Sequence, residues 1–286
     1  NFSFGDYFKR EAIDWAWNWL TEDLGLPKER LVVTVFDGTG EDAPADDEAA
    51  ELWAAHVPRG RIYRCSAKDN FWQMGDTGPC GPCSEIHIYK DAVAPATADV
   101  PGTDPAHADG DYVELWNLVF MQYEKLADGT LLSLPKPSID TGAGLERVSA
   151  VLQGKTSNYE GDLLRSLVEK AAELAKKPYG GTQGNDDVSM RVIADHARTT
   201  AFLVAEGIFP DRAGREYVLR RVMRRAIRHG HRLGITKPFL HEVAGEVVRL
   251  MGDAYPELTR RKDVILAVAE QEEVRFRETI DRGLKL

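Results

Sequence analysis

The hydrophobic residues in the first half of the chain fall into short runs of the kind that form β-strands. Leu31–Phe36 and Tyr112–Gln122 are rich in β-branched and aromatic residues. Between Phe8 and Leu20 the apolar residues instead recur at helical spacing, and Gly25 ends this predicted helix. Weaker patterns predict the end of a strand at 1–4, a helix over about 47–56, extended segments at 61–64, 71–74, 84–89 and 132–140, and a helix that begins at Leu145.

The pattern changes beyond Gly154, where the apolar residues keep the helical period almost to the last residue. Residues 1–155 therefore contain strands and turns, whereas residues 156–286 contain helices, which predicts an α+β domain followed by an α-helical one. The stretches 75–83 and 92–111 are rich in Gly, Pro and other turn formers and are predicted to be loops. Helices are expected at 163–175, 188–207, 216–233, 240–251 and 261–284.

Composition narrows the class of protein. With 43% hydrophobic and 29% charged residues, the chain has the balance of a globular domain. No apolar run approaches the ~20 residues that a membrane helix needs, and three cysteines, an odd number, argue against a disulfide framework. We therefore expect a cytoplasmic protein with no membrane partner. The chain starts at Asn1 without Met and ends within a helical pattern, so we expect a fragment.

The charge is unevenly distributed. A net charge of −10 argues against nucleic-acid binding, but residues 211–232 carry eight arginines against Asp211 and Glu216. Arg220, Arg224 and Arg228 repeat at helical spacing, with Arg221 and Arg225 on the adjacent row, so they form a basic stripe suited to RNA phosphates. Taken alone, the stripe is better explained as the solvated face of an amphipathic helix. The opposite, packed face is expected to hold Val218, Leu219, Val222, Met223, Ala226 and Ile227.

Two segments have the residue types of ligand sites. The predicted turn Asp140–Arg147 is rich in Gly and opens a helix, which suits an anion, although a plain strand-to-helix turn explains it equally well. Cys80 and Cys83 have the CxxC spacing of zinc ligands, but zinc would need two more, and Cys65 and the pair His229/His231 do not form a second matching knuckle. Packed thiols in a tight loop are the preferred interpretation.

Six stretches together match one family in order along the chain. They resemble alanyl-tRNA synthetase, a class II aminoacyl-tRNA synthetase. The resemblance implies a class II antiparallel sheet with flanking helices, as a partial alanine-activating domain over 1–155, and a truncated helical domain for the tRNA acceptor stem over 156–286. The matching stretches are Asn1–Lys9, Asp69–Glu85, Glu114–Gln122, Leu134–Arg147, Arg191–His196 and Tyr217–Arg221.

The resemblance also implies a pocket for L-alanine. Asp140 would pair with the ammonium group, and Asn117 would orient the amino and carboxylate groups. Trp72 and Val119 would enclose the methyl group, and Gly142 would leave room at the pocket floor. Taken singly, Trp72 and Val119 are better explained as ordinary core residues, and Asp140 as the N-cap of the helix that follows; all of them together in the family's order favour the pocket.

ATP and Mg²⁺ are the implied cofactors. Arg147 matches the family's motif 3 arginine, which binds the ATP phosphates beside Gly144, and Lys9 matches a motif 2 lysine implicated in activation. Glu85 or Glu114 is the candidate Mg²⁺ ligand, since carboxylates suit this hard cation. The family's zinc belongs to an editing domain, which the resemblance puts beyond Leu286, so no zinc site is expected here.

The resemblance implies activation of L-alanine to alanyl-adenylate and its transfer to the 3′ end of tRNA(Ala). Arg212 departs from the family pattern, because better-known members have an Asn there that helps read the acceptor-stem G·U pair. Motif 1 and the motif 2 arginine would precede Asn1, so the chain alone is expected to be impaired. The alternatives are a non-catalytic acceptor-stem-binding module and a tRNA-independent amino-acid adenylating protein; the oligomeric state is left open. The expected tRNA-binding residues are Arg212, Arg220, Arg221, Arg224, Arg225 and Arg228.

Overall fold

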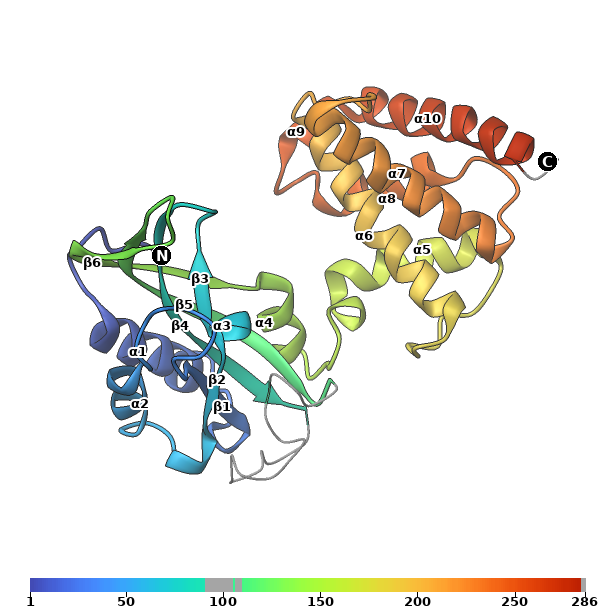
Figure 1. The fold of residues 1–286 in the computed structure, drawn as a ribbon. Helices are drawn as coiled ribbons and strands as arrows, with labels where there is room; N and C mark the ends of the chain where they lie inside the picture. Colours follow the sequence, from blue (N-terminus) through green and yellow to red (C-terminus); the bar gives the residue numbers. More distant parts are fainter. Residues whose placement is uncertain (91–104, 106–109, 284–286) are drawn as a thin grey trace. The chain divides into compact units, whose positions relative to one another are not determined.

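The computed structural model describes residues 1–90, 105 and 110–283, so the predicted loop 92–111 lies almost wholly outside the described residues. The chain divides into two compact units, 1–156 and 157–286 (Figure 1). The first unit combines a sheet with helices, and the described part of the second contains only helices and the loops between them.

The first unit is built on a six-stranded sheet with the order β2-β1-β4-β5-β6, in which β3 also pairs with β4. Neighbouring strands run antiparallel except β1 and β2, which are parallel, so the expectation of an antiparallel sheet is wrong at this edge. Parallel neighbours need a crossover connection, and α2 (Asp47–Trp53) lies in the segment that joins these two strands. The strands are β1 (Leu31–Phe36), β2 (Ile62–Cys65), β3 (Phe71–Gln73), β4 (Gly78–Tyr89), β5 (Tyr112–Lys125) and β6 (Leu131–Ala143).

Helices α1 (Lys9–Asn18) and α2 pack on one face of this sheet (Figure 1). Ile13, Trp17 and Leu20 enter a core with the inward residues of the central strands. Leu118 and Phe120 of β5 belong to this core, so the residues that alternate with them point to the opposite face. The short helix α3 (Ala67–Asn70) and helix α4 (Leu145–Leu152) complete the unit.

Two predicted turns are strands in the structure. Most of the predicted loop 75–83 belongs to β4, which begins at Gly78 and carries an irregularity between Cys80 and Cys83. A Cβ atom at Gly81 would overlap the Phe120 carbonyl oxygen, so only glycine lets the two backbones approach. The predicted turn after Asp140 likewise continues β6 to Ala143. Gly and Pro here serve close strand contact and a bulge, which local sequence alone does not separate from a loop.

The predicted end of a strand at 1–4 is present as a single bridge between Phe2 and Asp140. The Ser3 amide donates to the Ile139 carbonyl at 3.0 Å, and the Thr141 amide donates to the Asn1 carbonyl at 2.8 Å. These bonds extend the sheet beyond β6, so the first residues of the chain help hold the strand that carries Asp140.

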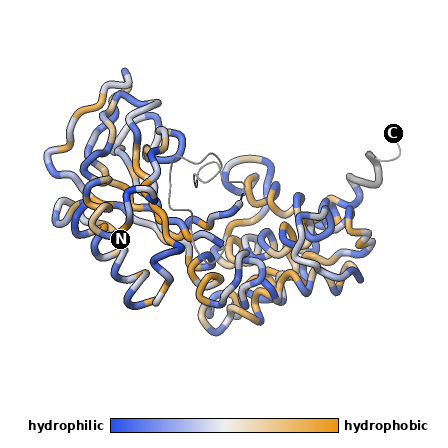
Figure 2. Tube along the Cα trace, turned by 90° about the horizontal axis from the view of Figure 1, so that it is seen from below, coloured by the Kyte–Doolittle hydropathy of each residue, from blue (hydrophilic) through white to orange (hydrophobic). Residues whose placement is uncertain are grey.

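The helical unit confirms the five predicted helices and adds the short helix α9. Small residues of α6, such as Ala194, Ala197 and Ala201, are fully buried and let neighbouring helices approach closely. Apolar and polar stretches alternate along these helices, as the colours of Figure 2 show. Among the described residues, no helix combines the length and the apolar composition that crossing a membrane requires. The helices are α5 (Asp162–Ala175), α6 (Asn185–Ala205), α7 (Gly214–Leu233), α8 (Leu240–Met251), α9 (Pro256–Arg260) and α10 (Lys262–Gly283).

Candidate functional site

The strand register gathers four of the predicted pocket residues on one face of the sheet. Asn117 of β5 lies opposite Gly142 of β6, and Val119 lies opposite Asp140. Residues in direct register share a face, and here it is the face opposite α1. Trp72 lies on β3, paired with Gly81 at the irregularity of β4.

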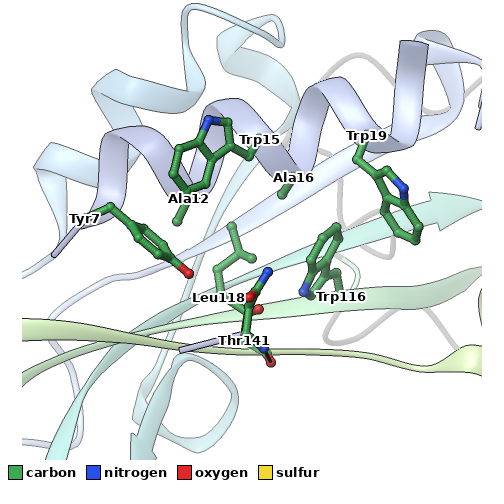
Figure 3. Close-up of a pocket in the computed structure, with 9 residues that line it drawn as sticks. Tyr7, Ala12, Trp15, Ala16, Trp19, Trp116, Leu118 and Thr141 are labelled. Atoms are coloured by element: carbon green, nitrogen blue, oxygen red, sulfur yellow. Dashed lines mark hydrogen bonds between the residues drawn. The ribbon is translucent and has the colours of Figure 1, made fainter. Parts of the chain in front are cut away.

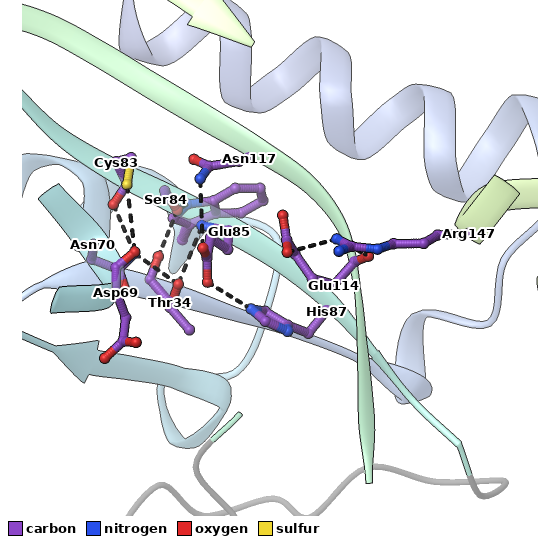
Figure 4. A network of polar contacts seen from close by, with 11 residues as sticks. Thr34, Asp69, Asn70, Cys83, Ser84, Glu85, His87, Glu114, Asn117 and Arg147 are labelled. Atoms are coloured by element: carbon purple, nitrogen blue, oxygen red, sulfur yellow. Dashed lines mark hydrogen bonds and ion pairs between the residues drawn. The ribbon is translucent and has the colours of Figure 1, made fainter. Parts of the chain in front are cut away.

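A polar network holds the strand positions next to Asn117 (Figure 4). The Asn117 amide nitrogen lies 3.5 Å from Glu85 Oε1, and His87 Nε2 lies 3.0 Å from Glu85 Oε2. Buried Asn70 donates to Thr34 Oγ1 and to the Cys83 carbonyl, both at 2.8 Å. The network fixes Glu85 and Asn117 from the side of β1.

Asn117, Asp140 and Gly142 each have a side-chain atom or position that the described part of the protein does not bind or occupy. Asn117 Oδ1 is buried and has no hydrogen-bond partner among the residues that the structure describes. In the part of the chain that the structure describes, no hydrogen bond or ion pair is formed by the Asp140 carboxylate, which is only partly exposed. A Cβ atom at Gly142 would meet no atom of the described residues within 4 Å, so packing against them does not require glycine there. We call Asn117, Asp140 and Gly142 the open cradle; it offers two oxygen acceptors beside free space.

The predicted N-cap role of Asp140 is wrong. Helix α4 begins at Leu145 with Gly144 as its N-cap, and Asp140 lies within β6. Val119 is buried, as either the pocket or the core interpretation requires.

Arg147 lies at the start of α4 and is tied to the sheet through Glu114. Its Nη1 donates to Glu114 Oε2 at 2.6 Å and to the Glu114 carbonyl at 3.2 Å (Figure 4). The side chain is 42% exposed, so part of the guanidinium faces solvent. A Cβ atom at Gly144 would lie 3.1 Å from Arg147 Cδ, so the glycine makes room for this side chain.

Neither metal candidate is a free carboxylate. Glu114 pairs with Arg147, and Glu85 is bonded to His87 and Asn117. Among the described residues, no group of three or more His, Cys, Asp or Glu side chains could hold a metal ion. Mg²⁺ is commonly bound by one or two carboxylates together with substrate phosphates, so Glu85 or Glu114 fits only as part of such a shared shell.

The three cysteines are buried and form no disulfide among the described residues, as the packed-thiol interpretation predicts. They lie in or beside strands and not in a tight loop. Burial is the main cause that raises the pKa of the Cys80 and Cys83 thiols, so both stay protonated at neutral pH.

Lys9 does not join the open cradle. Its side chain is 4% exposed, and Nζ lies 2.6 Å from Asp46 Oδ1 and 3.2 Å from Glu48 Oε2. It also lies 5.4 Å from the centre of the Phe120 ring, on the helix-covered face of the sheet. Because Asp46 also accepts from the Ala49 amide at 3.1 Å, Lys9 supports the start of α2. This burial argues against the predicted role of Lys9 in activation.

A separate apolar hollow lies on the helix-covered face, with a volume of about 360 Å³ (Figure 3). Its wall residues Leu118 and Thr141 alternate along their strands with the cradle residues, so the sheet separates the two places. It contains none of the predicted site residues. Its lining is Asn1, Tyr7, Ala12, Trp15, Ala16, Trp19, Trp116, Leu118 and Thr141.

In the helical unit, the structure divides the predicted arginine stripe. Arg221, Arg225 and Arg228 are exposed. Arg220 and Arg224 instead donate through Nε to the same oxygen of Glu272 on α10, at 3.1 and 2.7 Å. A groove of about 600 Å³ follows this part of α7, with a lining of His196, Val218, Arg221, Val222, Arg224, Arg225, Arg228 and Phe276.

The packed face of α7 is largely as predicted, because Leu219, Met223, Ala226 and Ile227 are fully buried. Val218 is 58% exposed, so its assignment to the packed face is wrong. It lines the groove together with Val222. Arg212 is exposed, precedes α7 and does not line the groove.

The sequence interpretation did not single out Asn70, Thr34, His87 or Glu272. Asn70 lies within the matched stretch Asp69–Glu85, but its side-chain partner Thr34 is 36 residues away. Glu272 is 48 residues from Arg224. Helical spacing places it on a face of α10 but does not identify its partner.

Comparison with known proteins agrees with the family resemblance. The family model of class II tRNA synthetases (A) matches residues 1–286. The whole chain is 61% identical to the alanine–tRNA ligase of Sorangium cellulosum, of which it covers 31%. It is 56% and 53% identical to the alanine–tRNA ligases of Anaeromyxobacter sp. and Myxococcus xanthus, covering 32% of each. The chain thus spans about a third of the length of these curated relatives. It belongs to the class II tRNA synthetases, and the predicted resemblance is confirmed.

Proposed function

We propose that this chain activates L-alanine with ATP and supplies the alanyl group to the 3′ end of tRNA(Ala), as part of an alanine–tRNA ligase. The open cradle carries the proposal, because its acceptors and free space suit a small amino acid. The ammonium group pairs with Asp140 and donates to Asn117 Oδ1, which has no partner in the described part of the chain. Trp72 and Val119 enclose the methyl group.

Activation joins the alanine carboxylate oxygen to the α-phosphorus of ATP and releases pyrophosphate. The solvent-facing part of the Arg147 guanidinium neutralises phosphate charge, with Gly144 leaving room for that side chain. Glu85 or Glu114 would hold Mg²⁺ together with the phosphates, and the bound ion would supply further charge neutralisation there. Positioning and charge carry most of the rate.

Residues 156–286 bind the tRNA acceptor stem, and residues 1–155 hold the amino acid and ATP. The exposed stripe residues Arg221, Arg225 and Arg228 and the groove beside them support this assignment, because exposed cations contact phosphates without reading sequence. The three cysteines form no disulfide among the described residues, which suits a cytoplasmic enzyme.

Gly142→Ala tests the cradle. We expect the free energy of unfolding to change by less than about 1 kcal/mol, because the added methyl group meets no protein atom within 4 Å. The same methyl group would take space from alanine, and such overpacking costs about 1–3 kcal/mol, roughly 5- to 150-fold in kcat/KM for alanine. The measurement is alanine-dependent pyrophosphate–ATP exchange by the full-length protein.

Gly81→Ala is the matched comparison, because its methyl group would overlap the backbone of β5. We expect this variant to lose stability first. A stable Gly142→Ala protein with unchanged alanine kinetics would argue against the cradle. Absence of alanine-dependent exchange in the unaltered enzyme would favour the non-catalytic acceptor-stem module.

RNA binding is tested by its dependence on salt. The affinity for an acceptor-stem minihelix is expected to fall steeply as salt rises, since each phosphate contact releases counterions. Arg221→Ala together with Arg225→Ala should flatten the log–log slope by about two. An affinity that does not depend on salt, or a slope that both substitutions leave unchanged, would contradict phosphate binding by α7.

A further inference from the structure

We propose that Glu272 is a positioning residue that sets which arginines of α7 reach RNA: it withholds Arg220 and Arg224, and leaves Arg221, Arg225 and Arg228 as the phosphate contacts. The proposal rests on the proposed RNA-binding function of this unit and adds a residue that limits its charge.

The contact geometry carries the inference. Glu272 is 3% exposed, and Arg220 Nε and Arg224 Nε lie 3.1 and 2.7 Å from its Oε1. The arginine side chains are only 21% and 28% exposed, which is less than we expect of a side chain that is free to contact phosphates. One buried carboxylate therefore holds two cations of the stripe.

Phe276 limits Arg224 further. The guanidinium carbon of Arg224 lies 4.7 Å from the centre of the Phe276 ring, and both residues line the groove. A cation over an aromatic face is attracted to it. Arg224 therefore forms part of the groove wall, held by Glu272 at one contact and by Phe276 at another.

The hold of Glu272 on Arg220 and Arg224 also affects the balance of charge around the groove. Arg220, Arg224 and Arg228 lie four residues apart along α7, and like charges at this spacing repel. Glu272 offsets one of these positive charges.

His196 also lines the groove, and its Nδ1 lies 2.8 Å from Asp195 Oδ2. The hydrogen bond with His196 is the main cause that holds the pKa of Asp195 below its usual value, and nearby Arg198 and Arg225 add to it.

Loss of the carboxylate charge has a definite consequence for binding. Glu272→Gln keeps the side-chain volume and an acceptor oxygen but removes the negative charge, so it weakens the hold on Arg220 and Arg224. Released arginines add phosphate contacts, which are indifferent to sequence. Glu272 thereby limits non-specific binding and favours RNA whose phosphates match Arg221, Arg225 and Arg228.

The experiment measures minihelix affinity between 50 and 200 mM salt for the full-length protein and its variants. Glu272→Gln is expected to steepen the log–log slope by about one to two, and to reduce discrimination between the cognate minihelix and an unrelated RNA duplex. A slope change of one corresponds to about a fourfold change in relative affinity over this salt range. Glu270→Gln is the control, because it removes the same charge from an exposed position on α10.

A second comparison does not depend on the folding of the Glu272 variant. Arg225→Gln is expected to flatten the slope by about one, whereas Arg220→Gln should change it by much less than one. Equal flattening by the two substitutions, or a Glu272→Gln slope equal to that of Glu270→Gln in a folded protein, would overturn the role of Glu272. Salt-independent binding by the unaltered protein would instead overturn the proposed RNA-binding function.

Discussion

Lys9→Ala is expected to destabilise the first unit by about 3–5 kcal/mol, because it leaves the Asp46 carboxylate buried without its ion-pair partner. The Asp46 side chain is 2% exposed, and its oxygen lies 2.6 Å from Lys9 Nζ. Urea unfolding followed by tryptophan fluorescence measures the effect, because all six tryptophans of the chain belong to residues 1–156.

Lys28→Ala is the control for this prediction. It removes an ion pair of the same length, 2.6 Å to Glu22, but the two side chains are 55% and 63% exposed. Such solvated pairs contribute about 0–1 kcal/mol. Equal losses in the two variants would show that burial of the Lys9 pair does not matter.

The same pair separates a structural role of Lys9 from the predicted catalytic one. Lys9→Met combined with Asp46→Asn removes both charges and keeps an N-cap acceptor for α2. If Lys9 acts only in folding, this double variant should keep its alanine and ATP kinetics once folded. A large fall in kcat in a stable double variant would restore the predicted role in activation.

Asp140→Ala is expected to lower kcat/KM for alanine about 10- to 150-fold in the full-length enzyme, with little change in KM for ATP. An ammonium group would lose its counter-charge in the open cradle, and a hydrogen bond to a charged group contributes about 1.5–3 kcal/mol. Pyrophosphate–ATP exchange at varied alanine concentration measures the effect. Stability should change little, because no hydrogen bond of the Asp140 carboxylate is lost among the described residues.

Asp128→Ala serves as the comparison for Asp140. Its carboxylate accepts from the Thr130 amide at 2.9 Å in an exposed turn, on the same hairpin but away from the cradle. Alanine kinetics should be unaffected there. An Asp140→Ala enzyme with the alanine KM of the unaltered protein would remove Asp140 from the amino-acid pocket.

The cradle residues could be proposed from sequence because they lie in matched segments whose strand character is local. The apolar run Tyr112–Gln122 predicts a strand, and within it Asn117 and Val119 alternate with the buried Leu118. Their shared face follows from that alternation, but their pairing with Gly142 and Asp140 needs the register. A shift by one residue would turn every side chain to the other face.

The local sequence pattern wrongly predicted loops where glycine and proline allow two strands to approach closely. The segment that begins β4 has the composition of a loop, and the reason for Gly81 is the Phe120 backbone of another strand. The parallel pairing of β1 with β2 depends on how α2 crosses the sheet, which neither strand's sequence specifies.

The sequence by itself determined the family, the five longer helices of residues 157–286 and the longest strands, and it allowed the cradle residues to be proposed, because periodicity and matched motifs are properties of consecutive residues. Only the tertiary structure decided which partners Lys9 and the arginines on α7 have. Lys9 is bonded to a residue 37 positions away, and Arg220 to one 52 positions away. The electrostatic role of a charged side chain depends on how deeply it is buried and on which group it pairs with. Neither can be read from the sequence, because both arise when folding brings distant residues into contact.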